Sequence, residues 1–148
     1  MPLGATVARQ SLMDWEPGAH SSTFGGNPVS CAASLATLHL LKDGLVDNAA
    51  RMGERMLSAL RAMQARHPCM GDVRGKGLMI AVELIKDPQT KERDPALRKT
   101  VVERCYLRGL LVLGCGPNSV RFCPPLLISQ DQVDEALEIF EDALTACE

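Results

Sequence analysis

The spacing of apolar residues changes from a helical period to a strand period near Gly71, and this change constrains the fold more than any other feature. Upstream, apolar residues recur at steps of three and four, which predicts an amphipathic helix that ends near His67 and Pro68. Downstream, the segments DVRGKG and LMIAVEL predict two strands. A helix with one apolar face is stable only against another layer, so the helix and the strand pair are predicted to pack together. The helical stripe consists of Leu45, Ala49, Met52, Met56, Leu60 and Met63.

Four further elements follow in the second half of the chain. A helical pattern from Pro95 to Arg108 stops at Gly109, and the segments LLVL and SVRFC then predict two strands around the turn CGPN. Ser129, followed three residues later by Gln132, has the pattern of a capping box at the start of the last helix. The sequence therefore predicts an α+β architecture in which helices cover one small sheet. The apolar face of the last helix is formed by Val133, Ala136, Leu137, Phe140 and Leu144.

The first forty residues have a different pattern. PLGATVAR, with alternating apolar residues, predicts a short strand, and the Gly/Ser/Thr-rich loop GAHSSTFGGNP follows it. Asn27 is a favourable N-cap, and Pro28 suits the first position of a helix. The Ala/Leu-rich stretch from Ser30 to Leu41 predicts a helix buried on several sides, with Gly44 as its end.

The charge pattern argues against polyanionic partners. The formal net charge is −2 and the basic residues occur singly, so there is no footprint for nucleic acid or for an anionic membrane. We expect no membrane span, because no stretch reaches the roughly 18 apolar residues that a span needs. We also expect no secretion signal. A small molecule or a protein is the expected partner.

The six cysteines are expected to be free, mostly buried thiols. They form neither a CxxC pair nor a Cys/His cluster with zinc spacing. His20, His39 and His67 lie far apart in the sequence without metal-like neighbours, so no metal site is predicted. No serine or cysteine is paired with a base in a known motif, so no catalytic nucleophile is assigned. Free thiols fit a reducing cytoplasm best.

Two segments contain residue types that are typical of binding sites. In SSTFGGNP, hydroxyl groups and two glycines precede a helix N-terminus, which favours a phosphate site; the alternative is a tight turn before a capped helix. In NSVRFCPPL, Arg121 alternates with Val120 and Phe122 on a short apolar strand. A guanidinium in apolar surroundings needs an anionic partner. That partner is either a substrate carboxylate in a bidentate contact or an internal Asp or Glu.

Four segments in this order resemble class III pyridoxal-phosphate aminotransferases of fold type I, the family of 4-aminobutyrate, ornithine and acetylornithine aminotransferases. They are PLGATVAR, HSSTFGGNPVSCAAS, DVRGKGLMIAVEL and VRFCPPL, and the resemblance covers essentially the whole chain. It implies that residues 1–43 are the end of the α/β large cofactor-binding domain, with a strand, a phosphate-contacting loop and a linking helix. Residues 44–148 would form the α+β small C-terminal domain.

The resemblance also implies roles for individual residues. Thr23, with Ser22 beside it, would contact the phosphate of pyridoxal 5'-phosphate bound in the neighbouring subunit of a homodimer. Arg121 would bind the carboxylate of the amino-acid or 2-oxo-acid substrate. A mainly structural role would fall to Arg74, Gly75 and Gly77.

The lysine that carries the cofactor in this family has no counterpart in the chain. In the family it lies a few residues before the segment that PLGA matches, and the aspartate that pairs with the pyridine nitrogen lies further upstream. The chain by itself is therefore expected to be inactive, with no catalytic residue of its own. The lysines that are present match helix ends or loops of the small domain: Lys42, Lys76, Lys86, Lys91 and Lys99.

The enzyme that the resemblance implies would transfer an amino group from an ω- or α-amino acid to a 2-oxo acid, with 4-aminobutyrate as the nearest type of donor. Two alternatives stay open. One is an amino-acid racemase on the same scaffold. The other is a truncated, inactive chain that either binds a full-length partner or has no function.

Overall fold

The computed structural model describes residues 1–147, and the chain divides into two compact units, Met1–Gly44 and Leu45–Glu148. A short π-helical segment, η2 (Leu41–Leu45), contains the break between them. Within it, Asp43 has φ −88° and ψ 37°, and Gly44 has φ 99°. A positive φ is left-handed backbone, which glycine adopts because it has no Cβ. The predicted helix end at Gly44 is therefore confirmed.

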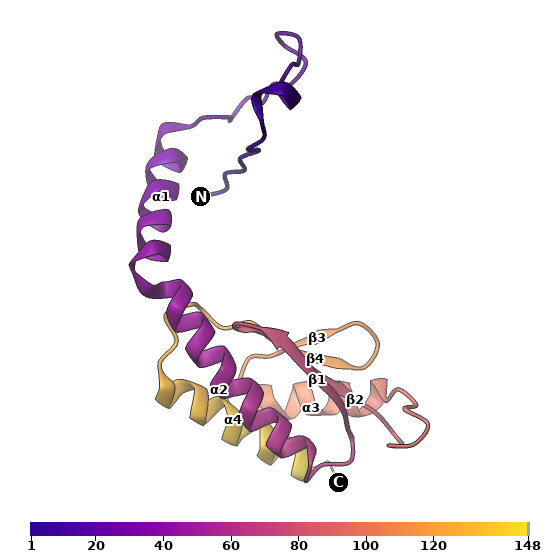
Figure 1. Cartoon of the computed structure of the whole chain (residues 1–148). Coiled ribbons are helices and arrows are strands. Elements are labelled where there is room, and N and C mark those ends of the chain that lie inside the picture. Colours follow the sequence, from indigo (N-terminus) through magenta and orange to yellow (C-terminus); the bar gives the residue numbers. More distant parts are fainter. Residues whose placement is uncertain (148) are drawn as a thin grey trace. The chain divides into compact units, whose positions relative to one another are not determined.

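The first unit contains a single-turn 3-10 helix, η1 (Gln10–Leu12), and the helix α1 (Pro28–Leu40) (Figure 1). The predicted N-cap of α1 is confirmed. The side-chain oxygen of Asn27 accepts hydrogen bonds from the backbone N–H groups of Val29 and Ser30, at 3.0 and 3.2 Å. Pro28 lacks an N–H, so it leaves no donor unsatisfied at the first helical position.

The prediction of a strand over PLGATVAR is wrong for this chain. Residues 2–9 form no strand, and the first backbone hydrogen bond in this unit joins the N–H of Leu12 to the carbonyl of Arg9. A strand exists only when a neighbouring strand satisfies its backbone groups. No such neighbour lies in the part of the chain that the structure describes, so the alternating pattern stays without a partner.

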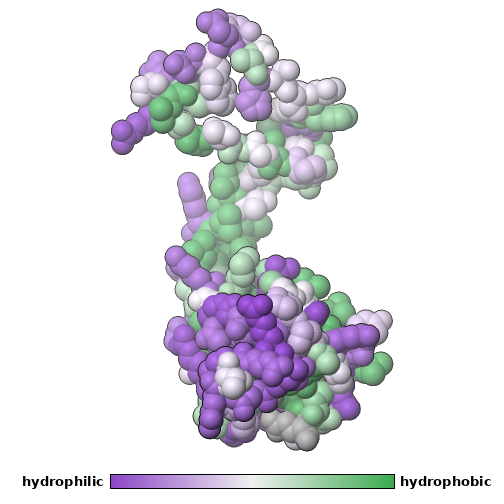
Figure 2. Space-filling view, turned by 90° about the vertical axis from the view of Figure 1, so that its right-hand side faces the viewer, coloured by the Kyte–Doolittle hydropathy of each residue, from purple (hydrophilic) through white to green (hydrophobic). Residues whose placement is uncertain are grey.

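The prediction that the first helix is buried on several sides is also wrong. In α1 only Ser30 is buried, and large apolar side chains such as Leu35 and Leu38 are more than half exposed. Figure 2 shows α1 as a largely hydrophobic surface. Helical periodicity predicts where apolar residues lie on a helix. It does not show whether another element covers them. Exposed apolar surface of this kind is typical of surfaces that contact a protein, a membrane or a ligand.

By length and composition, one helical stretch, Pro28–Gln64, is apolar enough to cross a membrane, contrary to the expectation from the sequence. The break at Asp43 and Gly44 divides this stretch. The continuous helix α1 has 13 residues, which at 1.5 Å per residue is about 20 Å. A bilayer core is about 30 Å thick, so α1 alone is too short to span it.

The second unit is an antiparallel sheet with three helices, and it confirms the predicted α+β architecture. The strand order is β1-β2-β4-β3; α2 and α3 pack on the sheet, and α4 packs against α2 and α3 (Figure 1). The elements are α2 (Val46–Gln64), β1 (Met70–Lys76), β2 (Met79–Leu84), α3 (Pro95–Leu107), β3 (Leu113–Cys115), β4 (Ser119–Phe122) and α4 (Gln130–Thr145).

The third strand lies further along the chain than predicted. The segment LLVL was expected to pair, but β3 begins only at its last residue, Leu113, and continues to Cys115. Pairing with β4 fixes this register, since Leu113 lies opposite Arg121 and Cys115 opposite Ser119. The turn between the strands contains Gly116 with φ 56°. Residues 110–112 are consequently a connection from α3 rather than part of the sheet.

The core lies between the helices and one face of the sheet. Val82 and Val120 are fully buried on that face, and Leu60 of α2 is fully buried against it. Phe122 meets Phe140 of α4 edge to face, with ring centroids 5.1 Å apart. The predicted capping box is confirmed, because the side chains of Ser129 and Gln132 each accept a hydrogen bond from the other residue's backbone N–H. Ala143, which the pattern did not include, is buried, whereas Ala136 is only partly buried.

Gly53 allows α2 to approach the turn between β1 and β2. A Cβ at this position would lie 2.2 Å from the carbonyl oxygen of Gly77, which is backbone and cannot swing aside. Gly53→Ala is therefore expected to destabilise the fold by about 1–3 kcal/mol, as overpacking does, although alanine is the better helix former by about 1 kcal/mol. Urea unfolding of the chain measures this, with Ser58→Ala on the exposed side of α2 as the control. A Gly53→Ala chain more stable than wild type would show that the close approach is absent.

Candidate functional site

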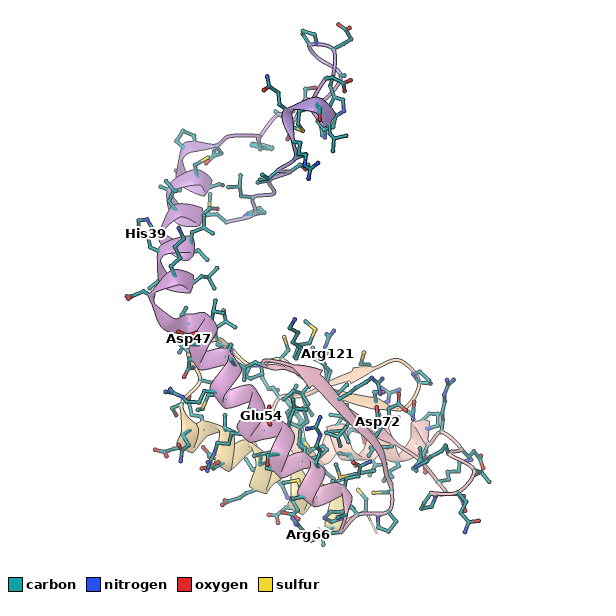
Figure 3. The ribbon with its side chains drawn as sticks, in the orientation of Figure 1. His39, Asp47, Glu54, Arg66, Asp72 and Arg121 are labelled. Atoms are coloured by element: carbon teal, nitrogen blue, oxygen red, sulfur yellow. The ribbon has the colours of Figure 1, made fainter. Side chains whose placement is uncertain are left out.

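Arg121 lies in the middle of β4, on the face of the sheet opposite the core. Its neighbours along the strand, Val120 and Phe122, are buried on the face that the helices cover. Because successive side chains alternate between faces, Arg121 belongs to the opposite face. Figure 3 shows its side chain projecting from the sheet on the side away from α4. A strand in a sheet holds such a side chain at a fixed position.

The Arg121 guanidinium has no protein partner among residues 1–147. Its Nε is buried without a hydrogen bond, and no described Asp or Glu forms an ion pair with it. A buried donor left without an acceptor costs about 1–3 kcal/mol, so native structures seldom retain one without a reason. The internal carboxylate that the sequence left open as a partner is thus not found in the described part of the chain.

A cavity of about 400 Å³ lies beside Arg121 and is large enough for a small organic molecule. Arg121 and Gln132 are the polar side chains in its wall. Apolar walls exclude water, which strengthens an ion pair or hydrogen bond made to the guanidinium. Among the apolar residues in the wall are Met56, Leu110, Leu113, Phe122, Pro124 and Ile128.

A second arginine lies in the same row of the sheet. Arg74 of β1 is opposite Ala81 of β2, and Ala81 is in turn opposite Arg121. Arg74 donates to Asp72 at 2.6 Å and lies 2.8 Å from a carboxylate oxygen of Glu83. The hydrogen bond to Asp72, and to a smaller extent the one to Glu83, raises the pKa of the Arg74 guanidinium above its ordinary value.

Sequence reasoning assigned Arg74 only a structural role and did not identify this cluster. The alternation in DVRGKG and LMIAVEL already places Asp72 and Arg74 on one face of their strand, and Ala81 and Glu83 on one face of theirs. What the sequence lacks is the register between the strands. The structure supplies that register and brings the two arginines into one row.

The loop before α1 presents free hydroxyl groups. Ser22 and Thr23 are exposed, and neither hydroxyl, nor the backbone N–H of Thr23, has a hydrogen-bond partner among the described residues. The Ser22 carbonyl accepts from the N–H of Gly25 at 3.2 Å, which closes a turn. These groups fit a phosphate, which accepts several hydrogen bonds at once.

At the helix end, two backbone donors are already occupied. The N–H groups of Val29 and Ser30, which would face an anion, already donate to the side chain of Asn27. A phosphate at this loop would therefore be held by Ser22 and Thr23 rather than by the helix N-terminus. The tight turn before a capped helix, which the sequence left open as the alternative, is present, and the phosphate site stays a prediction.

The remaining predictions concern metals and thiols. No disulfide joins the cysteines within residues 1–147. Of the six, Cys105 is buried and the other five are partly or fully exposed, so the expectation of mostly buried thiols is wrong. Within residues 1–147, no group of three His, Cys, Asp or Glu side chains is arranged to bind a metal ion. Burial raises the pKa of the Cys105 thiol to about 11, which makes it a poor nucleophile.

Comparison with known proteins gives consistent matches over nearly the whole chain. The family model "Aminotransferase class-III" matches residues 1–144. The chain is 41% identical to an isoleucine 2-epimerase from Lentilactobacillus buchneri over 100% of this chain and 33% of that protein. It is 35% identical to an acetylornithine aminotransferase from Caldanaerobacter subterraneus over 97% of this chain and 35% of that protein. A Bacillus anthracis aminotransferase structure has a TM-score of 0.82 at 34% identity, over 86% of this chain and 30% of that one.

The chain spans about a third of the length of the curated relatives that it matches. The solved structures similar to it include transaminases of fold type I, of which it covers about 30%, and the chain itself forms a small α+β domain with a four-stranded antiparallel sheet. The fold class predicted from the sequence is therefore confirmed.

Proposed function

Because the chain belongs to the class-III aminotransferase family, we propose that it supplies the substrate-carboxylate contact of an enzyme that uses pyridoxal 5'-phosphate to transfer an amino group from an ω- or α-amino acid to a 2-oxo acid. The observation that carries the proposal is Arg121, a partly buried guanidinium that lies beside an apolar cavity and has no partner among the described residues. A carboxylate is the anion that amino donors and 2-oxo-acid acceptors have in common. Amino acids of the 4-aminobutyrate type are the donors that we favour.

In this proposal Arg121 binds and orients the substrate. Its planar fork of N–H groups donates to both oxygens of a carboxylate, which fixes the direction in which the rest of the substrate extends. Ala81 and Leu113, its neighbours on β2 and β3, carry no charge and offer no competing partner. Orientation of this kind lowers the entropic cost of reaching the reactive geometry.

Ser22 and Thr23 are proposed to hold the cofactor phosphate in the neighbouring subunit of a homodimer. Their free hydroxyls and the Thr23 N–H provide the donors. Pyridoxal phosphate supplies, when bound, the electron sink that stabilises negative charge on the substrate carbon that loses a proton. Cysteines that form no disulfide within residues 1–147 support a reducing cytoplasm as the location of the reaction.

A second candidate is racemisation of an amino acid on the same scaffold. The observation that favours it is the 41% identity to an isoleucine 2-epimerase across the whole chain, against 35% to an acetylornithine aminotransferase. Both reactions begin with a carboxylate-bearing amino acid, so both assign the same role to Arg121. They differ in the products: transamination turns the donor into an oxo compound and the 2-oxo acid into an amino acid, whereas racemisation gives the opposite enantiomer.

A chimeric enzyme tests the proposal. The preceding two thirds of the Lentilactobacillus buchneri epimerase are joined to the 148-residue chain at the start of the matched region. With pyridoxal phosphate, the chimera is expected to convert 4-aminobutyrate and 2-oxoglutarate to glutamate, whereas the 148-residue chain alone shows no turnover because it has no cofactor lysine. Formation of D-allo-isoleucine from L-isoleucine instead would favour the second candidate.

The unmodified epimerase serves as the control for cofactor loading and assay conditions. A folded chimera that binds the cofactor, as its visible absorbance would show, but converts neither substrate would contradict both candidates. Turnover by the 148-residue chain alone would contradict the assignment of the cofactor lysine to another part of the enzyme.

A further inference from the structure

We propose that Arg74 is a positioning residue that keeps Arg121 available for its ligand by holding the carboxylates of Asp72 and Glu83. This inference rests on the proposed carboxylate-binding role of Arg121. It assigns Arg74 a function in ligand binding although Arg74 itself does not touch the ligand.

The sheet register places the four charged side chains on one surface. Arg74 and Arg121 flank Ala81 in a single row, so their backbones are two strand spacings apart, roughly 9–10 Å. Glu83 follows Ala81 by two residues and therefore lies on the same face, diagonal to Arg121. Diagonal neighbours in an antiparallel pair are about 7–8 Å apart, which is within the reach of long side chains.

Glu83 is therefore an internal competitor for Arg121. A carboxylate near a guanidinium without a partner gains a charge-assisted hydrogen bond by turning toward it. In the structure Glu83 instead pairs with Arg74, at 2.8 Å. Ala81, the small residue between the arginines, places no bulky side chain between Glu83 and Arg121. The Arg74 contact is thus the interaction that holds Glu83 away.

The contact geometry suits this role. Arg74 uses one terminal nitrogen for Asp72 and the other for Glu83, so a single guanidinium occupies two carboxylates. Lysine has a single terminal nitrogen and lacks the planar fork that makes this double contact. The side chains are partly exposed, at 55% for Arg74 and 35% for Glu83, so the pair contributes little to stability. We expect the ion pair to fix the position of the Glu83 side chain.

Side-chain NMR on the 148-residue chain tests this directly. The Nε–H signal of Arg121 is assigned by its loss in Arg121→Lys, and sodium acetate is titrated against sodium chloride at matched ionic strength. The wild-type signal is expected to shift with acetate. In Arg74→Gln the apparent dissociation constant for acetate is expected to rise about twofold to fivefold, the change that competition from a partly exposed ion pair supports.

Three further variants separate positioning from a general structural effect. Arg74→Gln/Glu83→Gln removes the competitor and is expected to restore wild-type acetate affinity. Arg74→Lys keeps a cation and is expected to weaken acetate binding less than Arg74→Gln does. Arg55→Gln, which removes a comparable ion pair with Asp134 between α2 and α4, is expected to leave acetate binding unchanged.

Each outcome has a separate meaning. If the wild-type Arg121 signal does not respond to acetate, the carboxylate-binding role fails, and the proposed function fails with it. If the wild type responds but Arg74→Gln binds acetate equally well, only the positioning role is overturned. A loss of affinity in Arg74→Gln that Glu83→Gln does not restore also overturns it, because the effect then does not pass through Glu83.

Discussion

Arg121→Lys in the chimeric enzyme is expected to lower kcat/KM for amino-acid substrates roughly ten- to a hundredfold. Lysine keeps the positive charge but loses the planar fork that binds both carboxylate oxygens. A hydrogen bond to a charged group contributes about 1.5–3 kcal/mol, and each 1.36 kcal/mol corresponds to about tenfold in rate. Steady-state kinetics with 4-aminobutyrate, or with L-isoleucine if racemisation is the activity found, measures the effect.

An amine without a carboxylate provides the matched control for Arg121. Its half-reaction is expected to be nearly indifferent to Arg121→Lys, because the guanidinium recognises only the carboxylate. Urea unfolding of the same variant is expected to give a free energy of unfolding close to wild type. A variant that unfolds readily while its folded fraction keeps normal kcat/KM would show that Arg121 is structural.

Phe140→Ala is expected to lower the free energy of unfolding of the chain by about 3–5 kcal/mol, the largest stability effect that we predict. Phe140 is fully buried on α4, and its ring meets Phe122 edge to face at 5.1 Å. Removing the ring forfeits buried apolar area and leaves a cavity between the last helix and the sheet. Urea denaturation followed by far-UV circular dichroism measures the change.

Leu107→Ala is the control for Phe140, because Leu107 is 79% exposed on the last turn of α3. Its effect is expected to lie within about 0.5 kcal/mol of zero, as for most surface substitutions. Equal effects of the two substitutions would mean that α4 does not close the core as the structure shows.

The unpaired start of the chain shows the limit of pattern reasoning. PLGATVAR has the alternation of a strand and α1 has the composition of a buried helix, yet the first forms no strand and the second is mostly exposed. Alternation and periodicity describe which side of an element is apolar. Burial and pairing depend on a partner element, and none is present in the described part of this chain.

Much of the second unit could be predicted because its signals are local. The helix stop at Gly109 and the capping box of Ser129 and Gln132 each involve residues within one turn of one another. The apolar faces of α2 and α4 follow from the helical repeat. Such features follow from short-range sterics and hydrogen bonding, so the sequence by itself determined them, and it also identified Arg121 as a cation on an apolar strand.

Only the tertiary structure decided how Arg121 is surrounded. The sequence left an internal carboxylate and a ligand as equal alternatives, and it did not connect Arg74 with Arg121, which lies 47 residues further along the chain. The register of β1 with β2 and of β2 with β4 places the two arginines in one row and gives Glu83 to Arg74. Strand register is set by packing of whole elements against a shared core, so contacts across the sheet arise only when the chain has folded.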